Sequence, residues 1–321
     1  MPVNPIPYPL DGRLERAALS PLLSAFLGLI LAFILFQGIS TVAVLVLLLA
    51  KGVTLGDLMA AISQPGGLAA YADDLIIGNT IGQVFGLLIP ALLFARLHSS
   101  RWPAFLRMNT GDVRTVVLSV VGLFALIPVV QWLGIWSDSL PWPDSIRLFE
   151  KQQMDLIESV LLQDFSLVFT ISMLALTPAI CEEVLFRGYI QRQAERSMGI
   201  WAGIAFSGII FGLYHLRPTQ ALPLSLLGIY LAYITWRSGS LMPAILVHLA
   251  NNSLAAVLGK MASSGAIEVD LETYELPLSI FLPSVVVLVG ILWLLHSSRP
   301  VPATPDTVEA IDGHATEGDN H

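Results

Sequence analysis

Residues 22–50 read LLSAFLGLILAFILFQGISTVAVLVLLLA, a run without a single charged side chain. A helix needs about 17 to 25 apolar residues to cross the hydrocarbon core of a bilayer, so this run is long enough to span it. The pattern recurs along the chain, approximately over residues 75–97, 115–136, 165–190, 200–216, 221–236, 241–259 and 277–296. The sequence therefore predicts an all-α fold, a polytopic transmembrane helical bundle of about eight spans. The segments 200–216 and 221–236 are short, so one of them could instead be re-entrant.

The composition agrees with a protein embedded in a lipid bilayer. Hydrophobic residues make up 55% of the chain and charged residues only 12%, about half the charged share of a soluble domain. The single cysteine, Cys181, excludes an internal disulfide framework and a Cys-rich zinc site. The net charge of −8 argues against nucleic acid as a partner, because phosphates bind basic surfaces.

Orientation follows from the distribution of Lys and Arg residues. Eleven of the 16 lie in segments on the same side of the membrane as the N-terminus, and five lie on the other side. Because positive charge is enriched in cytoplasmic loops, we expect both termini in the cytoplasm. The first apolar run is far longer than the apolar part of a signal peptide, so we expect it to be retained.

Five parts of the chain differ in character. Residues 137–164 mix apolar and charged side chains, which is typical of an amphipathic helix in the membrane interface. The parts are a cytoplasmic N-terminal segment (1–21), N-terminal spans with the interfacial helix (22–164), a core with intramembrane polar residues (165–260), a last loop and span (261–296) and a disordered acidic cytoplasmic tail (297–321).

The fourth predicted span contains two adjacent carboxylates, at a cost of about 2.5 to 3.5 kcal/mol for each ionisable group at membrane depth. Glu183 and Arg187 are four residues apart on one helical face and can pair. Glu182 points about 100° away and needs a partner from another helix. Pro178 cannot donate a backbone hydrogen bond to the carbonyl of Leu174, so we expect a local opening there. These charges could also be structural links between helices.

Two histidines follow on later spans. A hairpin that turns near residues 197–199 would set Glu182 and His215 at equal depth, about 25 Å from the turn, so that the two side chains meet. His248 and Asn252 share one face of the seventh span, and either could be an interhelical clamp. A carboxylate and an imidazole can activate water, while a second imidazole and an amide can hold an oxyanion. Alternatively, Glu182, His215 and His248 could hold zinc.

Together these positions form the motifs Glu182-Glu183-x-x-x-Arg187, Phe211-x-x-x-His215 and His248-x-x-x-Asn252. In order and spacing they resemble those of the CPBP family, the CAAX prenyl proteases and bacteriocin-processing enzymes that are also called Abi or type 2 CAAX proteases. The resemblance covers roughly residues 165–260.

The resemblance implies an intramembrane endopeptidase whose active site opens toward the cytoplasm. Carried over by motif, Glu182 and His215 would activate water, and His248 and Asn252 would stabilise the oxyanion. Residues that would shape the site are Glu183, Arg187 and Phe211. The family has been described both as metal-dependent and as glutamate-dependent. Because Asn252 is a poor zinc ligand, we favour no obligatory cofactor, with zinc as the alternative.

Two other classes of function stay open at this stage. A non-catalytic membrane immunity or scaffold protein would use the same polar residues to hold helices together. A proton-coupled transporter could use the glutamates and histidines as a relay, but transporters usually contain internal repeats, and this sequence has none. For an endopeptidase we expect a membrane-associated protein or peptide as the substrate, and the sequence does not indicate whether it is prenylated.

Overall fold

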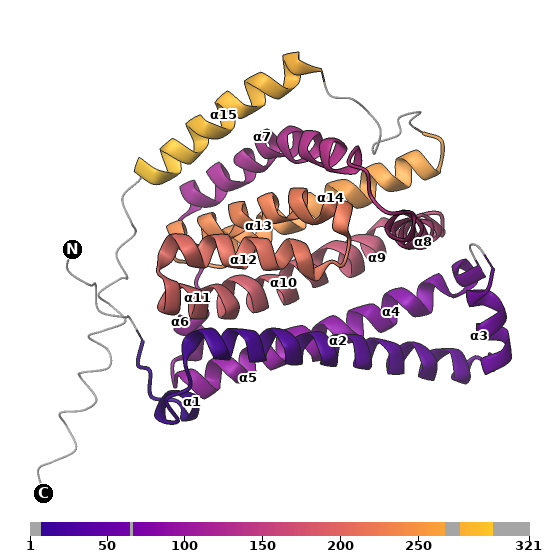
Figure 1. Cartoon of the computed structure of the whole chain (residues 1–321), viewed down its shortest axis with the longest axis horizontal. Helices are drawn as coiled ribbons and strands as arrows, with labels where there is room; N and C mark the ends of the chain where they lie inside the picture. Colours follow the sequence, from indigo (N-terminus) through magenta and orange to yellow (C-terminus); the bar gives the residue numbers. More distant parts are fainter. Residues whose placement is uncertain (1–7, 65–66, 267–276, 298–321) are drawn as a thin grey trace, which may run out of the picture.

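The computed structural model describes residues 8–64, 67–266 and 277–297, and every regular element within these ranges is helical (Figure 1). The predicted tail lies outside the described residues from residue 298 onward, as does part of the last loop, 267–276. The elements are α1 (Arg13–Arg16), α2 (Pro21–Ala50), α3 (Leu55–Ile62), η1 (Gly67–Tyr71), α4 (Ala72–Gly82), η2 (Gln83–Leu88), α5 (Ile89–His98), α6 (Trp102–Phe105), α7 (Val113–Asp138), α8 (Asp144–Leu161), α9 (Leu167–Ile171), η3 (Ser172–Leu176), α10 (Thr177–Glu183), η4 (Val184–Ile190), α11 (Gln191–Met198), α12 (Ile200–Tyr214), α13 (Pro218–Ser238), α14 (Met242–Ser263) and α15 (Leu278–Ser297).

Each of the eight predicted segments corresponds to a helix or to an unbroken run of helical elements. Within the described residues, six helices are long and apolar enough to cross a membrane: Pro21–Ala50, Gly67–His98, Val113–Asp138, Leu167–Met198, Met242–Ala262 and Leu278–Ser297. The segments 200–216 and 221–236 form two separate helices, α12 and α13, of which α12 has only 15 residues. The protein is thus an all-helical membrane protein, while eight crossings and cytoplasmic termini stay predictions.

Helix α2 shows how the local sequence defines such a span. Ser20 precedes it and accepts a hydrogen bond from the backbone N–H of Leu23, and Pro21 occupies the first turn, where no N–H partner is needed. The helix is apolar on all sides, and large side chains such as Ile34 remain 60% exposed. An apolar helix with an exposed apolar surface is suited to contact with lipid.

The long helices pack side by side around the run from α9 to α11 (Figure 1). Helices α2, α4 and α5 form one flank, and α7 and α15 form the other, with α12, α13 and α14 between them. One hydrophobic core joins α2, α5 and α6 to the segment that carries Glu183. A second core joins α7, α13, α14 and α15. The motif-bearing segment therefore lies between two packed groups of helices.

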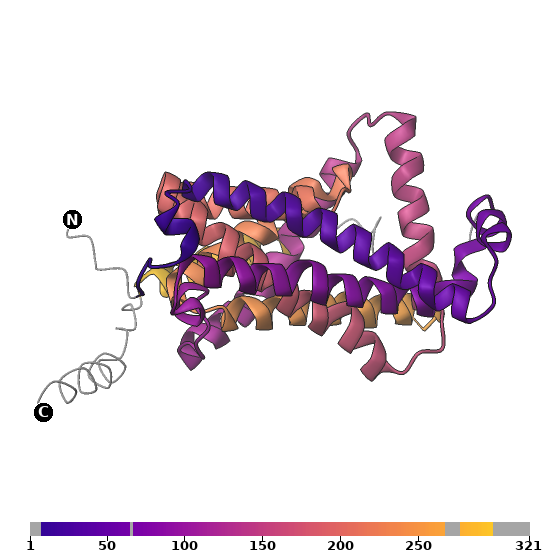
Figure 2. The ribbon, with the colours of Figure 1, turned by 90° about the horizontal axis from the view of Figure 1, so that it is seen from below.

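Helix α8 lies within the predicted amphipathic segment 137–164 and runs across the direction of the long helices (Figure 2). Its Glu150 is buried and accepts hydrogen bonds from the backbone N–H of Thr219 at 2.8 Å and from its hydroxyl at 2.7 Å. These bonds satisfy the first turn of α13, where a carboxylate also interacts favourably with the helix dipole. Helix α8 thus holds the turn between α12 and α13, immediately after His215.

The hairpin between α11 and α12 turns where the sequence predicts it. Gly199 separates the two helices with φ of +83°, a conformation that suits glycine and strains other residues. Farther along, α12 and α13 approach closely at Gly208 and Gly228. A Cβ at Gly208 would lie 2.4 Å from the backbone nitrogen of Ile229. Small residues thus allow the backbones of these two helices to touch, as in other membrane helix pairs.

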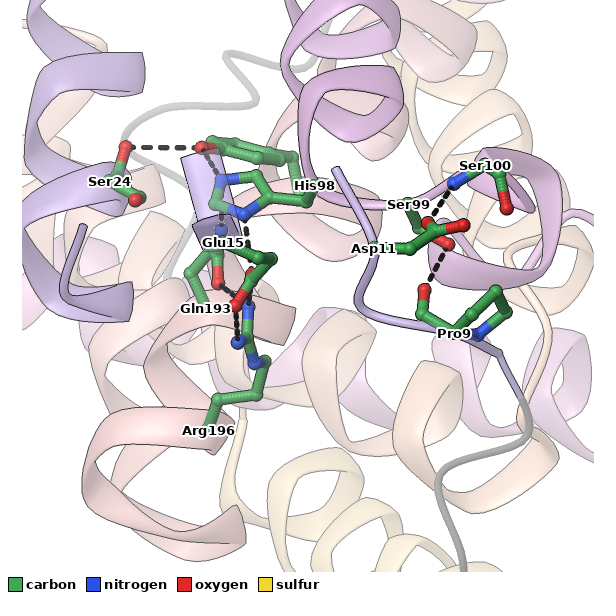
Figure 3. A network of polar contacts seen from close by, with 10 residues as sticks. Pro9, Asp11, Glu15, Ser24, His98, Ser99, Ser100, Gln193 and Arg196 are labelled. Carbon is green, nitrogen blue, oxygen red and sulfur yellow. Dashed lines mark hydrogen bonds and ion pairs between the residues drawn. The ribbon is translucent and has the colours of Figure 1, made fainter. Parts of the chain in front are cut away.

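A polar network ties the N-terminal segment to the same end of the bundle (Figure 3). Glu15 accepts hydrogen bonds from Arg196 at 2.8 Å and from Nδ1 of the fully buried His98 at 2.6 Å. On its other nitrogen, His98 accepts a hydrogen bond from Gln193 at 2.7 Å and lies 3.2 Å from the Tyr189 hydroxyl. The network joins α1 and α5 to the elements that follow the two adjacent glutamates.

The stability of this network is expected to depend on pH through Glu15. Burial would raise the pKa of Glu15, but hydrogen bonds from Arg196 and His98 outweigh it and lower that pKa below its ordinary value. The stabilisation is therefore complete above the pKa of an unfolded glutamate, about 4.3, and is lost as the pH falls through the lowered value. Between about pH 5 and pH 3, we expect the thermal unfolding midpoint in detergent to fall more steeply for the wild type than for Glu15→Gln. Parallel slopes would contradict this role.

Candidate active site

The helix that carries the two glutamates is locally widened on both sides of them. Short π-helical segments, η3 and η4, flank α10, and Pro178 lies in the first turn of α10. Pro178 has no backbone N–H to donate to the Leu174 carbonyl. This carbonyl instead accepts a 3.4 Å hydrogen bond from the Asn252 side chain of α14. The predicted local opening is therefore present, and a residue from another helix occupies it. Such π-helical turns are frequent at functional sites.

Glu183 lies at the centre of a fully buried polar cluster. Its Oε1 accepts a hydrogen bond from Arg187 Nη1 at 2.8 Å, the i,i+4 pair that the sequence predicts. The same oxygen accepts one from His248 Nδ1, also at 2.8 Å. Neither the Glu183 nor the Arg187 side chain is exposed. One oxygen of a fully buried carboxylate is thus held by donors from two different helices.

Arg187 connects this cluster to the α12–α13 hairpin. Its Nη2 donates to the carbonyl of Gly228 at 3.1 Å, and its guanidinium carbon lies 4.2 Å from the centre of the Phe211 ring. A cation over an aromatic face gains more when both are desolvated, as they are here. Arg187 thus bridges three elements, and the Phe211 ring packs against its guanidinium.

Phe211 also separates and orients the two histidines. Its ring centre lies 4.8 Å from that of His215 and 5.8 Å from that of His248, with edge-to-face geometry in both pairs. The Nδ1 atom of His215 lies 2.8 Å from the Phe211 carbonyl oxygen. Since a carbonyl can only accept, this nitrogen carries the proton, and Nε2 of a neutral His215 holds a lone pair.

Glu182 has a different environment from its neighbour. Its side chain is 16% exposed, and its Oε2 lies 4.0 Å from Nε2 of His248. That oxygen is buried and has no hydrogen-bond partner among the described residues. The sequence predicts that the hairpin brings Glu182 and His215 together. In the described part of the chain, the histidine within ion-pair distance of Glu182 is His248. Both histidines nevertheless contact the same Phe211 ring.

Asn252 lies one helical turn beyond His248, as its spacing predicts, and its amide is engaged with Leu174. The neighbouring Asn251 donates to the Asn252 side-chain oxygen at 3.2 Å. A bond of 3.4 Å is longer than the usual range for N–H donors. The Asn252 amide is therefore held near the opened helix by a weak contact that a better acceptor could replace.

The donor atoms do not converge as a metal site requires. In the described ranges, no group of three or more His, Cys, Asp or Glu side chains is arranged to hold a metal ion. Because Nδ1 of His215 and of His248 donates a hydrogen bond, only their Nε2 atoms could bind zinc, and these are not gathered with Glu182 into such a group in the described residues. The set Glu182, His215 and His248 thus does not fit zinc in this arrangement, and no step below uses a metal.

Comparison with known proteins is consistent with the motifs. Residues 164–254 match a family described as type II CAAX prenyl endopeptidase Rce1-like. No curated protein and no solved structure that was compared matches the chain. The matched stretch contains all the motif residues, from Glu182 to Asn252. The matched family indicates a peptidase, and the six long apolar helices of the described residues are suited to a membrane. The match supports the resemblance to the CAAX protease family that the motifs predict.

Three features of the site have no signal in the motif spacing. The Gly228 carbonyl accepts a hydrogen bond from Arg187, and the Leu174 carbonyl accepts one from Asn252. The Tyr214 hydroxyl is buried beside His215 without a hydrogen-bond partner in the described structure. Only Leu174 could have been singled out, because Pro178 leaves its carbonyl without a backbone donor. The other two depend on how helices from separate parts of the sequence pack.

Proposed function

We propose that this chain cleaves peptide bonds of membrane-associated proteins or peptides by glutamate and histidine catalysis, at a site that opens toward the cytoplasm. The observation that carries the proposal is the unequal environment of the two adjacent glutamates. Glu183 is fully buried and its Oε1 accepts hydrogen bonds from Arg187 and His248, whereas Glu182 is 16% exposed and its Oε2 accepts none within the described residues. Each carboxylate keeps one oxygen without a hydrogen-bond partner in the described residues, but only the Glu182 side chain is partly exposed, so only Glu182 can meet an attacking water.

In this mechanism Glu182 and His215 act together as the general base. The lone pair on Nε2 of neutral His215 and the free oxygen of Glu182 receive hydrogen bonds from the attacking water. As the water oxygen bonds to the scissile carbonyl carbon, one proton passes to this base and the carbonyl electrons move onto oxygen. When the C–N bond breaks, the same proton goes to the leaving nitrogen.

His248 would stabilise the negative charge that develops on the carbonyl oxygen. Its Nδ1–H is donated to Glu183, so donation to an oxyanion requires a second proton, on Nε2. The resulting imidazolium is favoured by the Glu183 carboxylate behind it and by Glu182 at 4.0 Å from Nε2. Glu183 and Arg187 would thus act through His248, holding its ring and supporting its charge.

Asn252 has two possible roles, and one variant separates them. If Asn252 donates to the oxyanion, Asn252→Ala is expected to lower kcat by about 10²- to 10³-fold. If Asn252 only links its helix to Leu174, the same substitution would instead lower the free energy of unfolding by about 1 kcal/mol. We expect the fall in kcat together with a small fall in the unfolding midpoint. Turnover and thermal unfolding of the purified variant measure both, and an unchanged kcat would reduce Asn252 to the clamp alone.

The proposal is tested by incubating the purified protein with a membrane proteome and identifying new peptide termini. The Glu182→Ala variant serves as the control, and each protein is assayed with and without a chelator. We expect new termini with the wild type alone, and the same termini when the chelator is present. Equal termini with Glu182→Ala would overturn the mechanism. Loss of cleavage on chelation would point to the metal alternative, and a complete lack of cleavage would favour a non-catalytic membrane protein.

A further inference from the structure

Tyr214 is the residue before His215, at the last position of α12, and its hydroxyl group is buried without a hydrogen-bond partner in the described part of the chain. A buried hydroxyl is usually hydrogen-bonded, and one that is not needs an explanation. Three other buried polar atoms of the site, Glu182 Oε2, Glu183 Oε2 and Arg187 Nε, also lack a partner there. Four of the eleven such atoms in the described residues therefore belong to Tyr214 and to the glutamate–arginine motif.

Two aromatic rings fix the position of the Tyr214 ring. Phe186, one turn beyond Glu182, lies edge-on with ring centres 5.1 Å apart. Phe33 of α2 also lies edge-on, at 5.4 Å. Such pairs are favourable beyond the apolar area they bury and restrict the ring to one orientation. Helix α2 lies outside the family-matched stretch, so the N-terminal half of the chain contributes to the geometry of the site.

Phe186, which packs against the Tyr214 ring, lies one turn beyond Glu182 on the same face of its helix, so Tyr214 lies on the Glu182 side of that helix. The Tyr214 hydroxyl and Glu182 Oε2 form no direct hydrogen bond. One is a donor without an acceptor, and the other is an acceptor without a donor. A water molecule bound between two such groups would satisfy both. The phenol oxygen can donate to the water oxygen, and the carboxylate can accept one of the water protons.

We propose that Tyr214 is a positioning residue for the attacking water, an inference that rests on the proposed function. Its O–H donates a hydrogen bond to one lone pair of the water oxygen. Glu182 and His215 each accept a hydrogen bond from one of the two water O–H groups. The remaining lone pair then points to the scissile carbonyl carbon. No proton leaves Tyr214 in this step. The hydroxyl directs the nucleophile, and the base that removes the proton is unchanged.

The test is Tyr214→Phe in the full-length protein, which removes one oxygen and keeps the ring between Phe33 and Phe186. The substrate is a fluorescence-quenched peptide copied from the proteome cleavage site used most often by the wild type. Loss of one hydrogen bond to the nucleophile is expected to lower kcat about 10-fold, with KM unchanged. The thermal unfolding midpoint should not fall, because the lost hydroxyl has no partner within the described structure.

Tyr230→Phe is the matched control. Its hydroxyl is buried in the second core and donates to the Ser119 carbonyl at 2.6 Å. This variant should show the reverse pattern, a lower unfolding midpoint with an unchanged kcat.

The Phe33→Leu substitution probes the same position from α2. If Phe33 acts by holding the Tyr214 hydroxyl, its replacement lowers kcat in the wild type but not further in Tyr214→Phe, since contacting residues that act on one group are not additive. If Phe33→Leu lowered kcat by the same factor in Tyr214→Phe as in the wild type, the inferred role of Phe33 would be wrong.

Glu182→Gln, assayed in parallel, separates the two proposals. An inactive Glu182→Gln beside a fully active Tyr214→Phe overturns the inference about Tyr214 and leaves the proposed function intact. A raised KM with unchanged kcat in Tyr214→Phe also overturns it, because the hydroxyl would then bind substrate. Activity in Glu182→Gln, or no cleavage by the wild type, overturns both.

Discussion

Glu182→Gln is expected to lower the rate of peptide-bond cleavage by about 10²- to 10⁴-fold, the range attributed to a positioned general base, while the protein folds as before. The amide has the shape of the carboxylate but cannot take a proton from water. Little stability should be lost, because the side chain is 16% exposed and its Oε2 has no hydrogen-bond partner in the described residues. The measurements are kcat on the quenched peptide and the unfolding midpoint in detergent.

His215→Ala is the companion variant, because it removes the other half of the proposed base. It should also abolish cleavage without reducing the amount of protein in the membrane. If Glu182→Gln kept wild-type turnover while His215→Ala lost it, the base would be His215 alone, and the assignment of Glu182 would be wrong.

Glu183→Ala is expected to damage the fold, in contrast to its neighbour. It leaves the Arg187 guanidinium buried without a counter-ion, and breaking a buried pair by removing one partner costs about 3 to 5 kcal/mol. Arg187→Met should cost a similar amount, because Glu183 then keeps only His248. The free energy of unfolding, measured by reversible denaturation in mixed micelles, and the membrane abundance of each variant give the result.

The double variant Glu183→Gln with Arg187→Met tests whether the cost comes from the unpaired charge. Neither charge remains, so the double variant should be more stable than Arg187→Met alone. It should still be inactive, because His248 has lost the carboxylate that supports its second proton. If the double variant were less stable than Arg187→Met, the pair would contribute more than mutual neutralisation.

Adjacent residues can thus differ in role because of helix geometry alone. Glu182 and Glu183 are separated by about 100° around the helix. Glu183 faces its own i,i+4 arginine and α14, and it is fully buried. Glu182 remains 16% exposed, and its Oε2 lies 4.0 Å from Nε2 of His248. A glutamate pair in a sequence therefore does not mean two equivalent acids.

Features that depend on neighbouring residues could be predicted from the sequence. The long apolar runs determine the helices, because backbone groups in lipid must be satisfied within one segment. The Glu183–Arg187 pair follows from its i,i+4 spacing, and the turn at Gly199 follows from a polar stretch with a glycine. The resemblance to the CAAX protease family follows from three motifs in order. In each case the interacting groups lie within a few turns of one helix or within one short segment.

Only the tertiary structure decided which groups face each other across helices. It brings Nδ1 of His248 to Glu183, whereas the spacing of the motifs pairs His215 with Glu182. It also joins Glu15 to His98 and Arg196, and Phe33 to Tyr214. These contacts depend on the rotation and depth of each helix, which are set by packing at points such as Gly208 and Gly228. An apolar run determines that a helix forms, but its lipid-like surface specifies neither the rotation nor the neighbour.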